Sequence, residues 1–168
     1  ANPELIRTAA QTFGSQCIVV SIEAKRLDDG GYEAWVDYGR QPTGVDAIEW
    51  AQRAVDLGAG ELLVTSVDRE GMGRGYDTEL TSRIATRVPV PVIACGGAGR
   101  KEHVIDLMTQ GFPDAVSAAS LFHYHYMEPP ETLYMSSDEP TLRMGRHLDE
   151  GNVDYLKKRT SGGLPWTL

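Results

Sequence analysis

Basic residues are scarce in this chain of 168 residues: 16 lysines and arginines stand against 24 aspartates and glutamates, a net charge of −8 at pH 7. Nucleic acids and anionic membranes bind proteins chiefly through basic surfaces, so neither is expected as a partner. Long apolar runs are lacking too. No stretch approaches the roughly 18 residues of a membrane-spanning helix, and no signal peptide is visible. The sequence therefore predicts a cytoplasmic protein.

Cysteine is equally rare, with only Cys17 and Cys95. Neither belongs to a CxxC pair, which argues against a disulfide framework and against a cysteine-based metal site. Both lie in apolar, strand-like sequence, so we expect two buried free thiols in a reducing compartment. His123 and His125 would point the same way in an extended segment, but a metal site needs more ligands than these two. No metal and no cofactor is expected.

What the chain does contain is a repeat of short apolar strands, each followed by helical or irregular sequence. Continuous apolarity, as in Cys17–Ile22, is typical of a strand covered on both faces of a parallel sheet. Such repeats predict one α/β domain built on parallel strands. A hairpin strand is expected at Tyr32–Tyr38, followed by a loop over Gly39–Gly44. The other expected strands begin at Glu61, Pro89 and Ala115, and the expected helices are Asn2–Phe13, Asp46–Leu57, Thr78–Thr86 and Lys101–Thr109.

Two of these strands end in glycine-rich loops. The strand from Glu61 runs into Asp68–Asp77, which contains three glycines, and Cys95 is followed by Gly96, Gly97 and Gly99. Glycines let backbone N–H groups approach an anion, and the dipole of a following helix adds to the attraction. Asp77 is a suitable N-cap for the helix that follows. The pattern fits an anion site, but it also fits an ordinary solvated loop.

A carboxylate lies near the end of the first strand, at Glu23. Burial of a carboxylate is costly unless it is paired. One interpretation is therefore a salt bridge with Lys25, Arg26 or their neighbours, and the other is a group that transfers protons. The position alone leaves both open.

Several motifs, taken together and in order, resemble one family. They are NPELI (2–6), FGSQCIVVSIEAKR (13–26), TG (43–44), LGAGELLVTSVDREGMGRGYD (57–77), PVIACGGAG (91–99), EH (102–103) and DAVSAASLFH (114–123). Over residues 2–123 the chain is similar to the C-terminal half of the cyclase subunit of imidazole glycerol phosphate synthase, an enzyme of histidine biosynthesis. The resemblance implies half of a (β/α)8 TIM barrel, with four βα units in residues 1–123, an irregular insertion at 124–150, and a last helix and tail at 151–168.

The resemblance also implies an activity. Members of the family convert a ribulosyl nucleotide with a phosphate at each end, using ammonia from a glutaminase partner, and two aspartates serve as acid and base. The second aspartate corresponds to Glu23, and the first would precede Ala1. The resemblance places substrate binding at Thr65, Ser66, Asp68 and Cys95, and binding of one phosphate by the backbone of Glu70, Gly71, Gly97, Ala119 and Ser120.

Three positions depart from the family pattern. Glutamate replaces aspartate at 23 and at 70, and cysteine replaces serine at 95. The extra methylene of Glu23 moves its carboxyl by about 1.5 Å, and a misplacement of that size costs on the order of 100-fold in rate. These departures also fit a divergent paralogue that acts with a glutaminase partner on a different nucleotide or sugar. Three hypotheses about the chain itself stay open: a catalytic half-barrel, a phosphate-binding scaffold without activity, and a module that docks a glutaminase. Four strands cannot close a barrel, so we expect a homodimer or pairing with a complementary half.

Overall fold

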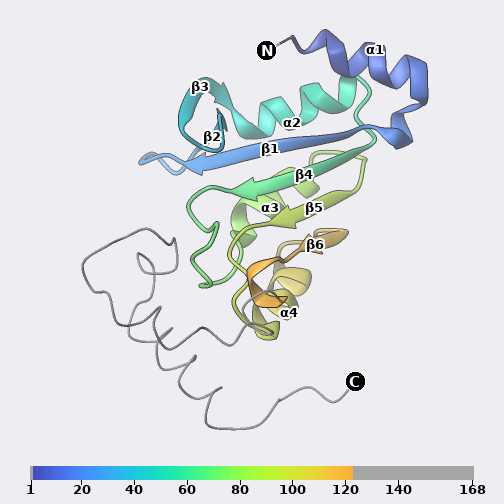
Figure 1. The fold of residues 1–168 in the computed structure, drawn as a ribbon. Helices are drawn as coiled ribbons and strands as arrows, with labels where there is room; N and C mark the ends of the chain where they lie inside the picture. The colour runs from blue at the N-terminus through green and yellow to red at the C-terminus, as the bar shows by residue number, and fades with distance from the viewer. Residues whose placement is uncertain (1, 123–168) are drawn as a thin grey trace, which may run out of the picture.

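The computed structural model describes residues 2–122, which form one six-stranded sheet with helices against it (Figure 1). The strands lie in the order β3-β2-β1-β4-β5-β6. The insertion, last helix and tail expected beyond residue 123, with the histidine pair, lie outside the described residues. The helices are α1 (Glu4–Phe13), α2 (Ala47–Asp56), α3 (Thr78–Ala85) and α4 (Lys101–Gln110), with a short 3-10 helix at Ser15–Cys17. The strands are β1 (Val19–Arg26), β2 (Tyr32–Val36), β3 (Gln41–Asp46), β4 (Glu61–Ser66), β5 (Val92–Cys95) and β6 (Ala115–Ser117).

The four strands expected from the βα repeats pair in parallel. β1 pairs with β4, β4 with β5, and β5 with β6, and helices α2, α3 and α4 connect them. The expected starts of α2 and α3 hold as well, because Asp46 caps α2 through the N–H groups of Ile48 and Glu49, and Asp77 caps α3 through that of Leu80. The α/β class with a parallel sheet is therefore confirmed.

The hairpin differs from expectation in its second strand. The segment predicted as a loop, Gly39–Gly44, mostly belongs to β3, which pairs antiparallel with β2. A strand was not expected there because Pro42 lacks an N–H group, but proline is tolerated on an edge strand, and β3 is one. The hydroxyl of Thr43 donates to the carbonyl of Ala34 and fastens this edge.

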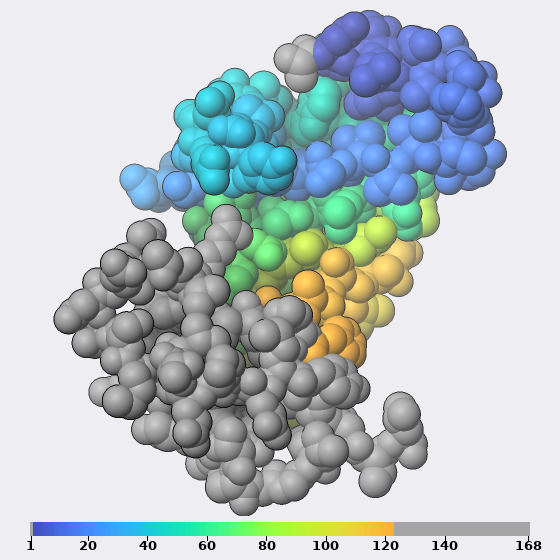
Figure 2. Space-filling view, in the orientation of Figure 1, coloured from blue at the N-terminus to red at the C-terminus, as the bar shows by residue number. Residues whose placement is uncertain are grey.

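The core lies on one face of the sheet only. Alternate strand residues such as Ile22, Leu62, Val64 and Val92 are at most 2% exposed and pack under the helices. The residues between them face the opposite side, which we call the open face. Ser21 is exposed there, and Leu63 and Ile93 are half-buried. Figure 2 shows the colours of the successive strands at the surface on this side. The expected cover on both faces is therefore missing within residues 2–122.

Several apolar side chains also lie at the surface instead of inside. Leu5 and Phe13 of α1 are 68% and 67% exposed, although their helical spacing suggested a buried stripe. In α4 the helical spacing of Val104, Ile105 and Met108 predicts an inward face. Ile105 and Met108 are instead exposed, and His103 and Leu107 are buried. Cys17 is exposed and Cys95 half-buried, so the prediction of two buried thiols is wrong. Apolar side chains of α1 and α4 are therefore left uncovered within residues 2–122.

Two strand edges of the parallel sheet lack a neighbour among the described residues. The hairpin pairs with β1 only from Glu23 to Arg26, which leaves the edge of Val19–Ile22 open. At the other end of the sheet, β6 has β5 on one side and no strand on the other. Unpaired edges are ready templates for further strands. Within residues 2–122 the parallel part of the sheet is thus open at both ends.

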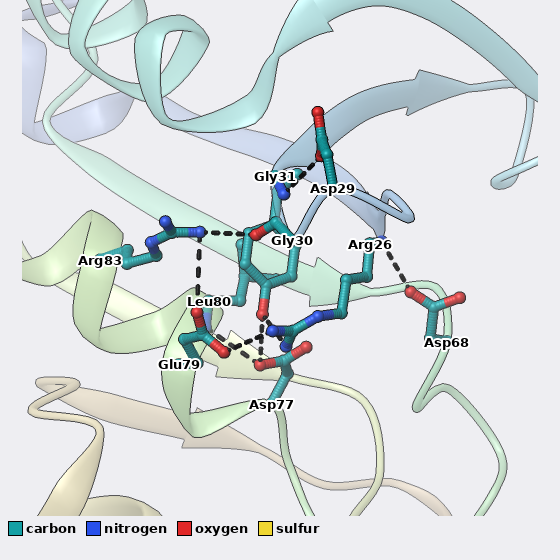
Figure 3. A network of polar contacts seen from close by, with 10 residues as sticks. Arg26, Asp29, Gly30, Gly31, Asp68, Asp77, Glu79, Leu80 and Arg83 are labelled. Atoms are coloured by element: carbon teal, nitrogen blue, oxygen red, sulfur yellow. Dashed lines mark hydrogen bonds and ion pairs between the residues drawn. The ribbon is translucent and has the colours of Figure 1, made fainter.

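A polar network around the buried side chains of Tyr32 and Asp77 ties the hairpin to α3 (Figure 3). The Tyr32 hydroxyl donates to the Asp77 carboxylate at 3.0 Å and accepts from the Arg26 guanidinium at 2.9 Å. Arg26 also pairs with Glu79 at 2.7 Å, and Arg83 donates to the carbonyl of Gly30. Burial beside the Asp77 carboxylate raises the pKa of Tyr32, so its hydroxyl stays protonated and remains a donor.

Replacing Tyr32 by phenylalanine is expected to lower the free energy of unfolding by about 1–3 kcal/mol, because it deprives the buried Asp77 of a donor. Urea denaturation measures the change. Tyr38, which is 81% exposed, gives the matched control: Tyr38→Phe is expected to change stability by less than about 0.5 kcal/mol. Equal stability of the two variants would show that the network contributes nothing.

Candidate functional site

Four half-buried side chains lie in one row across the open face. The strand register places Glu23 of β1 beside Thr65 of β4, Thr65 beside Cys95 of β5, and Cys95 beside Ser117 of β6. Neighbouring residues of parallel strands in register point to the same face. The row lies at or close to the carboxyl ends of the strands, the end at which barrel proteins carry their active sites. Three of its members were predicted as site residues.

Within residues 2–122 Glu23 is held by a backbone N–H group and by no salt bridge. Its Oε2 accepts the N–H of Gly39 at 2.6 Å. The two neighbouring cations are engaged elsewhere, since the Lys25 ammonium lies 4.3 Å from the centre of the Trp35 ring and Arg26 pairs with Glu79. Neither Lys25 nor Arg26 pairs with Glu23, which argues against the salt-bridge interpretation and favours the proton-transfer interpretation.

The two glycine-rich loops are packed against each other beyond this row. Gly75 donates its N–H to the carbonyl of Gly97 at 2.8 Å. At Gly97 φ is +106°, and a Cβ there would overlap the Gly75 carbonyl oxygen, so a side chain is excluded on two counts. A Cβ at Gly96 would meet the Glu70 carboxylate at 3.1 Å, which places Glu70 beside this loop.

The end of the first loop is fixed by two buried side chains. Tyr76 donates to the carbonyl of Ser117 at 3.0 Å, and burial raises its pKa to about 12. Asp77 caps α3 and accepts from Tyr32. At the start of the loop, the Asp68 carboxylate accepts the N–H of Arg26 at 2.8 Å, so this predicted substrate ligand already serves the backbone. These bonds join the loop to β1, β2 and β6.

The remaining predicted residues are placed less uniformly. Ser66 is 2% exposed, and it lies on the helix side of the sheet, away from the row. Ala119 and Ser120 follow β6, and Ala119 stands two residues beyond Ser117 as Gly97 stands two beyond Cys95. Gly97 and Ala119 therefore both lie just beyond the carboxyl ends of neighbouring strands, at one rim of the sheet. A separate cavity of about 220 Å³ is lined by Arg26, Asp68, Arg69, Met72, Arg74 and Asp77, none of them members of the row.

His103 supports the loops from α4. Its Nδ1 lies 3.1 Å from the Gly99 nitrogen and its Nε2 lies 3.0 Å from the Arg100 Nε. A neutral imidazole accepts one hydrogen bond, so the ring serves one of these donors at a time. Its Cδ2 lies within 3.6 Å of a Cβ built on Gly75. Burial, and then the charge of Arg100, lower the pKa of His103 below its usual 6.5.

This lowered pKa predicts a pH dependence of stability. The unfolded chain takes up the His103 proton near pH 6.5, whereas the folded chain takes it up only at lower pH. Stability is therefore complete above pH 6.5 and declines as the pH falls from 6.5 toward the folded pKa. We expect His103→Gln, which keeps an acceptor, to flatten this part of the profile. Urea denaturation between pH 8 and pH 5.5 tests it, and an unchanged slope in the variant would refute the assignment.

Residues 2–122 contain no group of three histidine, cysteine, aspartate or glutamate side chains placed to hold a metal ion. No helix within that range is long and apolar enough to cross a membrane.

Comparison with known proteins decides the family. The model of the family described as "Histidine biosynthesis protein" matches residues 1–128. The chain belongs to this family. It is 55% identical over 145 residues to "Imidazole glycerol phosphate synthase subunit HisF" of Lachnoclostridium phytofermentans. That alignment takes in 85% of the chain and 56% of the relative, so the chain spans about half the length of the curated relative it matches. The resemblance to the cyclase subunit is confirmed, and with it a barrel family.

Membership in the histidine biosynthesis family does not reveal every residue of the site. Gly39 and Ser117 were missed. Gly39 acts through its backbone N–H group, which every residue except proline has, so the sequence gives no signal for it. It also lies in a segment that was predicted to be a loop. Ser117 was detectable in principle, because it stands in β6 at the level where Cys95 stands in β5.

Proposed function

We propose that this chain is the half of an imidazole glycerol phosphate synthase cyclase that binds one substrate phosphate and carries one proton-transfer group. The observation that carries the proposal is the half-buried Glu23 carboxylate in the row on the open face, next to two interlocked glycine loops, in a member of this family. In this proposal Glu23 moves a proton on the substrate, and Thr65 and Cys95 contact it.

The phosphate is proposed to bind at the rim formed by Glu70, Gly71, Gly97, Ala119 and Ser120. Backbone N–H groups hold phosphates without basic side chains, which suits an acidic chain. The bonds from Gly75 to Gly97 and from Tyr76 to Ser117 support this proposal, because they fix the loops before an anion arrives. A fixed site binds at lower entropic cost.

The open sheet is proposed to be closed into a barrel by further strands. The edges at Val19–Ile22 and Ala115–Ser117 and the exposed open face support this proposal. A complementary N-terminal half is one candidate. A second copy is the other, in which β1 of each copy pairs with β6 of its partner and the two Glu23 carboxylates face a common mouth. The relative's name calls it a subunit, and a glutaminase is the further partner we propose, with the cytoplasm as location.

The proposal is tested by adding the part of the Lachnoclostridium phytofermentans HisF that this chain does not cover. We expect the mixture to form imidazole glycerol phosphate when ammonia and the ribulosyl nucleotide are supplied. Phosphate binding without turnover would favour the scaffold interpretation instead. Loss of both phosphate binding and turnover would contradict the proposal. Co-purification of the chain with a glutaminase would support the proposed glutaminase partner.

A further inference from the structure

The turn between β2 and β3, residues 37–40, reaches from the sheet edge to the candidate catalytic carboxylate. Gly39 lies 16 positions after Glu23, and its N–H donates to Oε2 at 2.6 Å. Hydrogen bonds to a carboxylate are short and strong compared with neutral ones. Among the described residues Oε1 has no protein donor. The turn therefore holds one oxygen of Glu23 and leaves the other for a ligand.

The backbone of this turn is unusual. Asp37, Tyr38 and Gly39 have φ values of +55°, +57° and +69°, so three successive residues are left-handed and two of them carry side chains. Such conformations persist only where their surroundings enforce them, and they gather at functional sites. One restraint is the bond from the Arg40 N–H to the Val36 carbonyl at 3.1 Å. The conformational strain of these left-handed residues is thus offset by the contacts around the turn.

Gly39 is also confined by the loop after β4. A Cβ built at this position would lie 3.0 Å from both methyl carbons of Val67, so the turn sits against Val67 with no room to spare. Val67 itself is fixed, because its N–H donates to the carbonyl of Ala24 at 2.9 Å. The N–H of Gly39 is therefore directed at Glu23 from a position set by Val67, which is itself bonded to β1.

We propose that this turn is a positioning element that sets the orientation of the Glu23 carboxylate and is matched to the length of a glutamate. An aspartate at position 23 would end about 1.5 Å short and lie about 4 Å from the Gly39 nitrogen, beyond hydrogen-bond range. The inference rests on the proposed function only in that Glu23 is the proton-transfer group. The carboxyl group of Glu23 extends further from the backbone than that of an aspartate would, and the turn fixes it at that longer distance.

Nuclear magnetic resonance of the full chain tests the contact without any turnover. The Gly39 amide proton is expected to shift with pH as the Glu23 carboxylate titrates. Glu23→Gln and Glu23→Asp are both expected to abolish that response. Glu33→Gln is the matched control, because Glu33 accepts the N–H of Gly44 at 2.6 Å in the same hairpin. It is expected to remove the response of Gly44 and leave that of Gly39 intact. A Gly39 amide that responds equally in Glu23→Asp would overturn the match to glutamate.

The effect on chemistry is measured in the barrel completed with the complementary half. Gly39→Ala pushes the turn away from Val67, and we expect kcat to fall on the order of 100-fold with KM unchanged. Gly39→Ala combined with Val67→Ala removes the two methyl groups and is expected to restore part of kcat. Unchanged kcat in Gly39→Ala would overturn the inference. A completed barrel that is inactive even with Glu23 and Gly39 intact would refute the proposed function instead, and the amide titration would still decide the contact.

Discussion

Replacing Glu23 by glutamine is expected to lower the turnover of the completed barrel by about 10²–10⁴-fold, the usual contribution of a general acid or base. Glutamine keeps the length of the side chain and an oxygen that accepts the Gly39 N–H, so the geometry of the site is preserved. Only the ability to exchange a proton is removed. Stopped assays of imidazole glycerol phosphate formation measure the loss.

The same variant separates catalysis from binding. The proposed phosphate site consists of backbone at the rim, so the affinity of Glu23→Gln for inorganic phosphate is expected to equal that of the parent chain. Glu33→Gln again serves as the control, because Glu33 accepts from Gly44 and Trp35 in the hairpin and lies outside the row. Full turnover in Glu23→Gln would show that Glu23 transfers no proton, and it would contradict the catalytic proposal.

The second large effect is expected at Gly97. A methyl group there overlaps the carbonyl oxygen of Gly75, and at a φ of +106° an alanine is strained as well. Gly97→Ala therefore forces the two glycine loops apart and breaks the bond between Gly75 and Gly97. Each hydrogen bond to a charged group that is lost at the rim costs about 1.5–3 kcal/mol. We expect the affinity for phosphate to fall by at least about tenfold.

Calorimetric titration with inorganic phosphate measures the loss in Gly97→Ala. Gly44→Ala is the matched control: φ is +73°, so the strain is comparable, but nothing lies within 4 Å of the added methyl group. It is expected to bind phosphate as the parent does. Equal affinities in the two alanine variants would show that the contact between the loops is irrelevant to the anion.

The parallel sheet was predictable because local signals agreed along the chain. The apolar strand cores, the glycines at the loops and the capping residues Asp46 and Asp77 each point to the same βα units. The glycine-rich loop Asp68–Asp77 was predicted to be part of an anion site, and Gly75, Tyr76 and Asp77 are its last three residues. The structure gives these residues mostly architectural tasks: a backbone bond to Gly97, a bond to Ser117, and a helix cap.

The errors arose where tertiary context decides. β3 contains a proline and a glycine among its six residues, so its own sequence opposes a strand, and only the pairing with β2 makes it one. The bond from Gly39 to Glu23 joins residues 16 apart through a backbone atom, which no residue pattern displays. Helical spacing finds an apolar stripe in α1 but does not say what covers it, and Leu5 and Phe13 are exposed in residues 2–122.

The open face of the sheet and its two open edges share one physical explanation. An amphipathic helix and a parallel sheet with an apolar inner face are stable only against another layer. The chain places the polar row and the phosphate rim at one end of that inner face. Closure by further strands would therefore cover the apolar surface and complete the mouth of the site in the same event.

Light scattering with and without the complementary half of the Lachnoclostridium phytofermentans HisF tests this closure most directly. For the 18.4 kDa chain alone at micromolar concentration we expect the mass of a dimer or binding of an apolar dye, and with the half we expect a one-to-one complex in which dye binding is lost. A monomer that binds no dye and ignores the complementary half would contradict the account.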